Sequence, residues 1–209
     1  MNFKKITVSF LLLILINFSA SALELKIPKI GGKKADISGA KLNFTKIFFE
    51  SSINYMEAQY HLFNALEMND EASKTKKSIA FVKDTKNKEG KRLTNAFKTS
   101  SENSKAIEGA LGKEKGLSAE GKVHYAKALP FAVKGLIGMV QLPPEANSLL
   151  KTIKSDKMAA LKMGDFLKVL PKIPEYVSSA TKVGNLIVTG AKSREVKGAD
   201  DATKALGDL

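Results

Sequence analysis

The chain has 209 residues, and its 34 Lys and Arg against 21 Asp and Glu give a formal net charge of +13. It contains no Cys, which excludes disulfides, thiolate metal sites and Cys nucleophiles, and its two His exclude a His-rich metal site. A hydrophobic fraction of 44% is sufficient for a packed core, so a disordered chain is also excluded.

Residues 1–22 have the pattern of a cleaved secretory signal peptide. Lys4 and Lys5 precede an apolar run, Ile6–Ile16, and the small residues of Ala20–Ala22 suit the signal peptidase. The run is shorter than the roughly 20 apolar residues of a membrane-spanning helix, and no Cys follows it, which excludes a lipoprotein. We therefore expect cleavage after Ala22 and a periplasmic or secreted protein.

The first long helix is predicted for residues 35–68, after an extended leader at 23–34. Asp36 or Ser38 is suited to cap it. Its apolar residues form two adjoining stripes at helical spacing, which predicts a wide buried face. One stripe contains Phe44, Phe48, Tyr55, Leu62 and Leu66, and the other contains Phe49, Ile53, Met56, Tyr60 and Phe63.

The segment 71–111 is more polar and has one narrow seam at a spacing of three and four. The seam contains Leu93, Phe97, Ser100, Ser104, Ile107 and Leu111. A narrow seam is typical of packing on one neighbour, so we expect an antiparallel hairpin with the first helix. Gly90 is a potential interruption within this segment.

A third helix is predicted for residues 117–142. Ser118 is suited to be its N-cap, and Glu120 adds a carboxylate to the first turn. Pro130 removes a backbone donor inside the helix and is expected to kink it. Pro143 and Pro144 then start a new segment.

Residues 147–170 are expected to form one helix bent near Ser155 or two short helices. Pro174 is suited to begin a last helix that runs to about Val196. A short tail is expected at residues 197–209. No alternation of period two persists, so strands are not expected. The sequence predicts an all-α domain over 35–196, an antiparallel bundle of four to six helices.

Two Glu–His pairs form a candidate polar site. Glu57 precedes His61 by four residues and Glu120 precedes His124 by four, so each pair shares a helix face. If the first and third helices pack together, the four side chains can converge. Di-metal carboxylate bundles instead use spacing three and two further Glu, and ordinary surface pairing also explains both pairs. No metal or cofactor is therefore expected.

The apolar stretch at Pro130–Val140 is the candidate ligand-binding element. Buried central packing explains it, but proline and glycines also create space between helices in which an apolar ligand or lipid can bind. The candidate contacts are Phe131, Val133, Leu136, Ile137 and Val140.

The positive charge is concentrated between Lys74 and Lys98, where nine basic residues accompany two acidic ones. A solvated helix face explains the run, and so does binding to anionic lipid headgroups, lipopolysaccharide or acidic glycans. Base readout favours Arg, and only Arg92 and Arg194 are present, so a nucleic-acid partner is not expected. Without a Gly-x-Ser-x-Gly elbow or a P-loop, we expect no enzyme.

Three short segments resemble a group of uncharacterised exported all-helical proteins of Gram-negative bacteria. They are Ala35–Gly39 (ADISG), Leu117–Leu129 (LSAEGKVHYAKAL) and Ala199–Leu206 (ADDATKAL). The resemblance implies a periplasmic location and carries no activity, substrate or site residue.

The expected function is non-enzymatic. We expect a cell-envelope protein that binds an apolar or amphipathic ligand or an anionic membrane surface. The alternative is a protein–protein adaptor or assembly factor of the envelope, because long helices with two apolar stripes can be completed by a partner. A metal-binding bundle or an enzyme ranks third.

Overall fold

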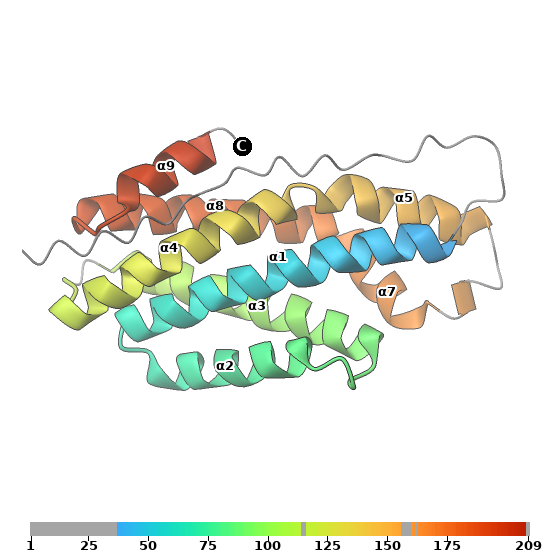
Figure 1. Cartoon of the computed structure of the whole chain (residues 1–209), viewed down its shortest axis with the longest axis horizontal. Helices are drawn as coiled ribbons and strands as arrows, with labels where there is room; N and C mark the ends of the chain where they lie inside the picture. Colours follow the sequence, from blue (N-terminus) through green and yellow to red (C-terminus); the bar gives the residue numbers. More distant parts are fainter. Residues whose placement is uncertain (1–36, 114–115, 156–159, 162, 208–209) are drawn as a thin grey trace, which may run out of the picture. The chain divides into compact units, whose positions relative to one another are not determined.

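The computed structural model describes residues 37–113, 116–155, 160–161 and 163–207 (Figure 1). Every regular element in these ranges is a helix and none is a strand, which confirms the all-α class for the described part of the chain. The predicted signal peptide, the leader and Asp36 lie outside the described residues.

The central helix is α1 (Ile37–Ala65), which contacts α2, α3, α4 and α5. Its first predicted stripe is buried almost throughout, with Phe44, Phe48, Tyr55 and Leu62 fully inaccessible. Because α1 packs against neighbouring helices on several sides, a wide face of it is buried. The helix ends where Glu67 adopts a left-handed φ of 60°, and the Met68 N–H then bonds the Phe63 carbonyl at 2.8 Å.

The polar segment predicted at 71–111 forms two helices, α2 (Asn69–Lys83) and α3 (Glu89–Leu111). The break precedes Gly90, which lies inside the first turn of α3. Asp84 ends α2 in an extended conformation, and its carboxylate accepts a hydrogen bond from the Lys86 N–H at 3.0 Å. The interruption therefore comes from a local turn at Asp84, and glycine is not its cause.

Helix α4 (Ala119–Met139) begins as predicted, because Ser118 Oγ accepts a hydrogen bond from the Gly121 N–H at 3.0 Å. Pro130 lies within α4, which continues as an α-helix beyond it. Helix α5 (Leu142–Ser155) starts next to the predicted Pro143–Pro144 break and carries Glu145 in its first turn.

Glycines on α4 lie against α1. A Cβ built on Gly121 would be 2.8 Å from the Ala65 carbonyl, and one on Gly135 would be 2.8 Å from the Tyr55 nitrogen. A Cβ on Gly138 would be 2.7 Å from the Cβ of Ser51. As residue numbers rise along α4 they fall along α1, so the two helices run in opposite directions (Figure 1). The missing side chains allow the two helices to approach closely.

The C-terminal part contains α7 (Gly164–Val169), a 3-10 turn η1 (Leu170–Lys172), α8 (Ile173–Ser193) and α9 (Ala199–Gly207). Pro174 lies in the first turn of α8, as expected. The predicted tail contains α9, which contacts α4 and α8 and has Ala199 and Ala202 buried. The division into a domain and a tail stays a prediction.

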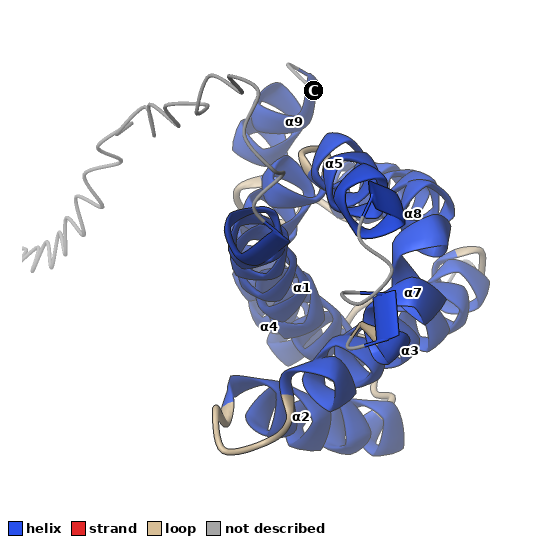
Figure 2. Ribbon diagram, turned by 90° about the vertical axis from the view of Figure 1, so that its right-hand side faces the viewer, coloured by secondary structure: helices blue, strands red, loops and turns tan. Residues whose placement is uncertain are grey.

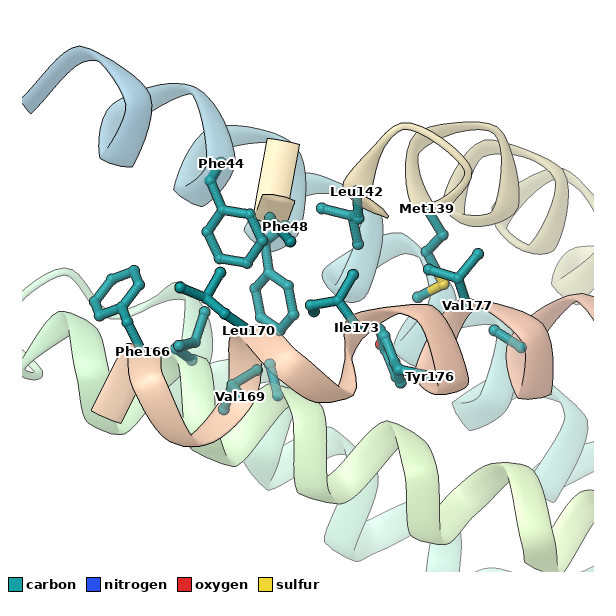
Figure 3. Packing of buried hydrophobic residues seen from close by; sticks show 14 of the residues in the cluster. Phe44, Phe48, Met139, Leu142, Phe166, Val169, Leu170, Ile173, Tyr176 and Val177 are labelled. Carbon is teal, nitrogen blue, oxygen red and sulfur yellow. The ribbon is translucent and has the colours of Figure 1, made fainter. Parts of the chain in front are cut away.

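Buried apolar residues form two clusters. Figure 3 shows the first, where aromatic rings of α1 meet side chains of α4, α5, α7 and α8, with Phe44 and Phe48 near Leu170 and Ile173. The second contains Leu62, Phe63, Ile107, Tyr125, Leu129, Val183 and Ile187, among others. The clusters bind α1, α4 and α8 together along most of their lengths.

A buried polar network accompanies the apolar clusters where α3 meets α1 and α8. The predicted seam residues Ser100 and Ser104 are both buried. Ser100 Oγ lies 2.7 Å from the hydroxyl of Tyr176 on α8, and Ser104 Oγ lies 3.0 Å from the hydroxyl of Tyr55 on α1. These hydrogen bonds satisfy polar groups that burial would otherwise penalise.

Candidate functional site

The imidazoles of His61 and His124 meet at the α1–α4 contact. Their ring centroids are 6.0 Å apart. The ring of Phe131 stacks on His61 at 5.7 Å with an interplanar angle of 20°, and Tyr60 lies 5.1 Å from the same imidazole. The opposed directions of α1 and α4 bring together two residues that are 63 positions apart in the sequence.

The two carboxylates of the candidate polar site do not form a cluster with the imidazoles. Glu57 Oε1 accepts a hydrogen bond from Lys83 Nζ of α2 at 2.7 Å. Glu120 is 88% exposed, and its nearer carboxylate oxygen lies 4.0 Å from His124 Nε2. Within the described ranges, no three or more His, Asp and Glu side chains are placed to hold a metal ion.

Burial affects the proton affinity of His61. Desolvation is the main reason that its pKa lies below the ordinary value of about 6.5, and the nearby His124 and Lys127 lower it further. Glu57 acts in the opposite direction. The Nδ1 atoms of both His61 and His124 are buried and have no hydrogen-bond partner among the described residues. Burial therefore favours the neutral form of His61.

Phe131 and Lys127 also belong to the surroundings of the His pair, in addition to the residues predicted from the sequence. They follow His124 by seven and three residues, which places both on the same face of α4. The sequence shows this spacing. It does not show the register of α4 on α1, and this register brings the shared face of α4 against His61.

The five candidate apolar contacts, four on α4 and Val140 at its C-cap, have different surroundings. Leu136 is buried and contacts Gly184 of α8, and Val133 packs against the second cluster. Phe131 lies under His61, whereas Ile137 and Val140 are 39% and 38% exposed.

Two surface hollows lie elsewhere. One is lined by residues of α3 and α8, such as Leu111 and Leu186, and the other lies around Val196 and Gly198. Neither includes a residue of 130–140. Ligand contacts by the five residues of α4 therefore stay a prediction.

The lysine-rich segment covers α2, the turn at 84–88 and the first turns of α3. Its eight lysines are exposed, namely Lys74, Lys76, Lys77, Lys83, Lys86, Lys88, Lys91 and Lys98. Helix α2 packs against α1 and α3 and lies at the margin of the helical unit (Figure 2). We call these eight residues the lysine surface.

Acidic side chains offset the lysine surface only in part. Lys83 pairs with Glu57 and Lys98 pairs with Glu102, whereas Glu89 at the start of α3 pairs with Lys41 of α1, outside this surface. Lys74, Lys76 and Lys77 have no ion-pair partner in the part of the chain that the structure describes.

Arg92 has a different role from the lysines. Its Nε donates to the Val82 carbonyl at 2.7 Å, and its guanidinium lies 4.4 Å from the ring centroid of Phe49. It thereby ties the start of α3 to the end of α2 and to α1.

No protein-family model matches the chain, and neither a curated protein nor a solved structure is significantly similar to it. No helix in the described ranges is both long and apolar enough to span a membrane.

Proposed function

We propose that this protein is an exported, non-enzymatic helical protein that binds anionic membrane surfaces of the cell envelope through the lysine surface. The observation that carries the proposal is the run of eight exposed lysines on α2, the following turn and the start of α3. Lys is a compact, strongly hydrated point charge, which suits phosphate-bearing headgroups and needs no fixed geometry. Each Lys near an anionic bilayer contributes about 1 kcal/mol of binding energy.

The proposed binding is electrostatic and does not involve insertion. The large apolar side chains that are exposed in the described residues include Leu42, Val123, Ile137 and Leu186, and none lies between residues 69 and 98. A surface without exposed apolar anchors remains in the headgroup region, and salt screens its attraction within about 10 Å at 0.1 M. The proposal therefore requires binding that high salt abolishes.

Vesicle co-sedimentation tests this proposal. Wild-type protein is expected to sediment with vesicles of phosphatidylglycerol and phosphatidylethanolamine at 50 mM salt and to be released at 500 mM. The triple variant Lys74→Gln, Lys76→Gln, Lys77→Gln is expected to bind roughly a hundredfold more weakly, since three charges are lost at about 1 kcal/mol each.

The matched control removes three exposed lysines of α5 and η1 and therefore the same net charge. It is the variant Lys151→Gln, Lys154→Gln, Lys172→Gln. This control is expected to keep most of the affinity. Equal losses in the two triple variants would show a general charge effect and would contradict an assigned surface, and no binding by wild type would overturn the proposal.

Binding of an apolar or amphipathic ligand has weaker support than surface binding. The glycines of α4 lie in close contact with α1, so they allow helix packing and do not leave space for a ligand. This form of the proposal depends on Phe131, Val133, Leu136, Ile137 and Val140. Native mass spectrometry of the purified protein tests it, and a bare chain mass would contradict it.

The alternative proposal is an adaptor or assembly factor of the envelope. It is favoured by the apolar side chains that α4 and its C-terminal end expose, among them Val123, Ile137 and Val140. A photo-crosslinking residue at position 137 is expected to give a discrete adduct in cells, whereas one at Thr85 in the lysine-rich turn is not. Equal or absent adducts at both positions would contradict the adaptor.

The proposal also concerns the location of the protein and the arrangement of its helices. We infer export through a signal peptide at 1–22 in the manner of the exported helical proteins that the chain resembles. We infer an antiparallel bundle with a long N-terminal hairpin, in which Pro130 bends α4 because it cannot donate to a preceding carbonyl. An intact mass of the periplasmic protein that includes Met1–Ala22 would contradict the cleavage.

A further inference from the structure

The contact between His61 and His124 joins two long helices. The imidazoles are 6.0 Å apart, and Phe131 stacks on His61 from the side of α4. Both Nδ1 atoms are buried without a hydrogen-bond partner in the ranges that the structure describes. Ring packing, including the stacked pair of His61 and Phe131, therefore makes this contact, and the buried Nδ1 atoms do not contribute hydrogen bonds to it.

Protonation of the imidazoles would add buried N–H groups that need hydrogen-bond acceptors. A neutral imidazole carries one proton, which Nε2 can hold while the buried Nδ1 stays bare. An imidazolium carries protons on both nitrogens, so one N–H of each charged ring would be buried without an acceptor. If both rings were charged, like charges would also lie about as far apart as the ring centroids, 6.0 Å.

The charged groups around the pair do not compensate a positive charge. On α1, Glu57 favours protonation of His61, but Lys83 of α2 already pairs with this carboxylate. On α4, Lys127 opposes protonation, and Glu120 is largely solvated at 4.0 Å from His124 Nε2. Two negative and two positive side chains therefore surround the rings.

We propose that His61 and His124 form an acid-sensitive contact, in which protonation weakens the packing of the N-terminal half of α4 on the C-terminal half of α1. This inference goes beyond surface binding and depends on different residues. Burial, followed by His124, lowers the pKa of His61. Once the pH falls below about 6.5, His61 therefore binds more protons in the unfolded chain than in the folded chain, and its contribution to stability declines with acidification.

Histidine titration by NMR is the direct test, because the chain contains only two imidazoles. His61 is expected to titrate below 6.5 in the wild type and to move upward in His124→Gln, which removes the neighbouring charge. In Glu57→Gln the same resonance is expected to move downward. A His61 pKa at or above 6.5, or one that His124→Gln leaves unchanged, would overturn the proposal.

Thermal unfolding gives a second readout. Between pH 7.5 and 5.0, the wild-type Tm is expected to fall by about 2–4 °C more than the Tm of the double variant His61→Gln, His124→Gln. Equal falls would contradict the proposal.

Hydrogen exchange on the wild type decides the question if the variants do not fold. After correction for intrinsic rates, residues 55–65 and 119–131 are expected to lose protection at pH 5.0 relative to residues 173–193 of α8. Unchanged relative protection would count against the acid-sensitive contact.

Discussion

The side-chain amide of Gln59 on α1 donates a 2.9 Å hydrogen bond to the backbone carbonyl of Ser100 on α3, and both residues are fully buried. The same amide lies 3.2 Å from Ser104 Oγ, and Gln59 Oε1 accepts from Asn103 Nδ2 at 3.1 Å. One glutamine thus links three residues of α3. Buried polar groups that are fully satisfied favour one register of two helices over its neighbours.

We expect Gln59→Leu to lower the free energy of unfolding by about 1–3 kcal/mol, because Asn103 loses an acceptor in a dry environment. Urea denaturation followed by circular dichroism measures the change. Asn185→Leu, an exposed amide on α8, is the control and is expected to stay within about 0.5 kcal/mol of wild type. A similar effect in both variants would show that the buried network has no special role.

We expect Gly135→Ala to destabilise the protein by about 1–3 kcal/mol, because the added Cβ would lie 2.8 Å from the Tyr55 nitrogen and force α4 away from α1. Gly109→Ala on α3 is the matched control. Apart from the adjoining backbone of α3, no atom lies within 4 Å of its added Cβ, so better helix propensity is expected to stabilise the variant by about 0.5–1 kcal/mol. The Tm is therefore expected to fall in Gly135→Ala and to rise in Gly109→Ala. A neutral Gly135→Ala would mean that α4 does not approach α1 this closely.

Loss of the hydroxyl of Tyr125 tests how α4 is joined to α8. This hydroxyl donates to the Ile187 carbonyl at 2.7 Å. Tyr125→Phe keeps the ring, so we expect a loss of about 0.5–1.5 kcal/mol in denaturant unfolding. Tyr60→Phe, on the partly exposed side of α1, is the control and is expected to change stability less. Identical losses would contradict a specific role for the α4–α8 bond.

Alkaline pH is expected to unfold the protein through its buried tyrosines. Burial raises the pKa of Tyr176 to about 12 and raises the pKa of Tyr55 and of Tyr125 further above the ordinary value of about 10. The unfolded chain therefore releases protons first, and stability is lost as the pH rises from about 10 to 12. Absorbance at 295 nm is expected to show these phenols ionising together with the loss of helical circular dichroism. Ionisation in a chain that remains folded would contradict their burial.

Local sequence was enough to predict several elements. Ser118 was identified as an N-cap because a hydroxyl next to an apolar periodic segment satisfies an unpaired N–H. The two stripes of α1 predicted a helix with neighbours on several sides. The turn at Asp84 was missed because Gly90 gave the stronger local signal. An Asp whose carboxylate accepts from the backbone N–H two residues later is difficult to distinguish from a helical Asp by sequence.

The sequence by itself determined the helical class and the candidate pairs, since periodicity and spacing act within one helix. It placed Glu57 with His61 and Glu120 with His124. Only the tertiary structure decided that the two imidazoles meet while Glu57 pairs with Lys83 of α2. The physical reason is register, because close contacts at Gly121, Gly135 and Gly138 fix how α4 lies along α1, and no local pattern encodes that alignment.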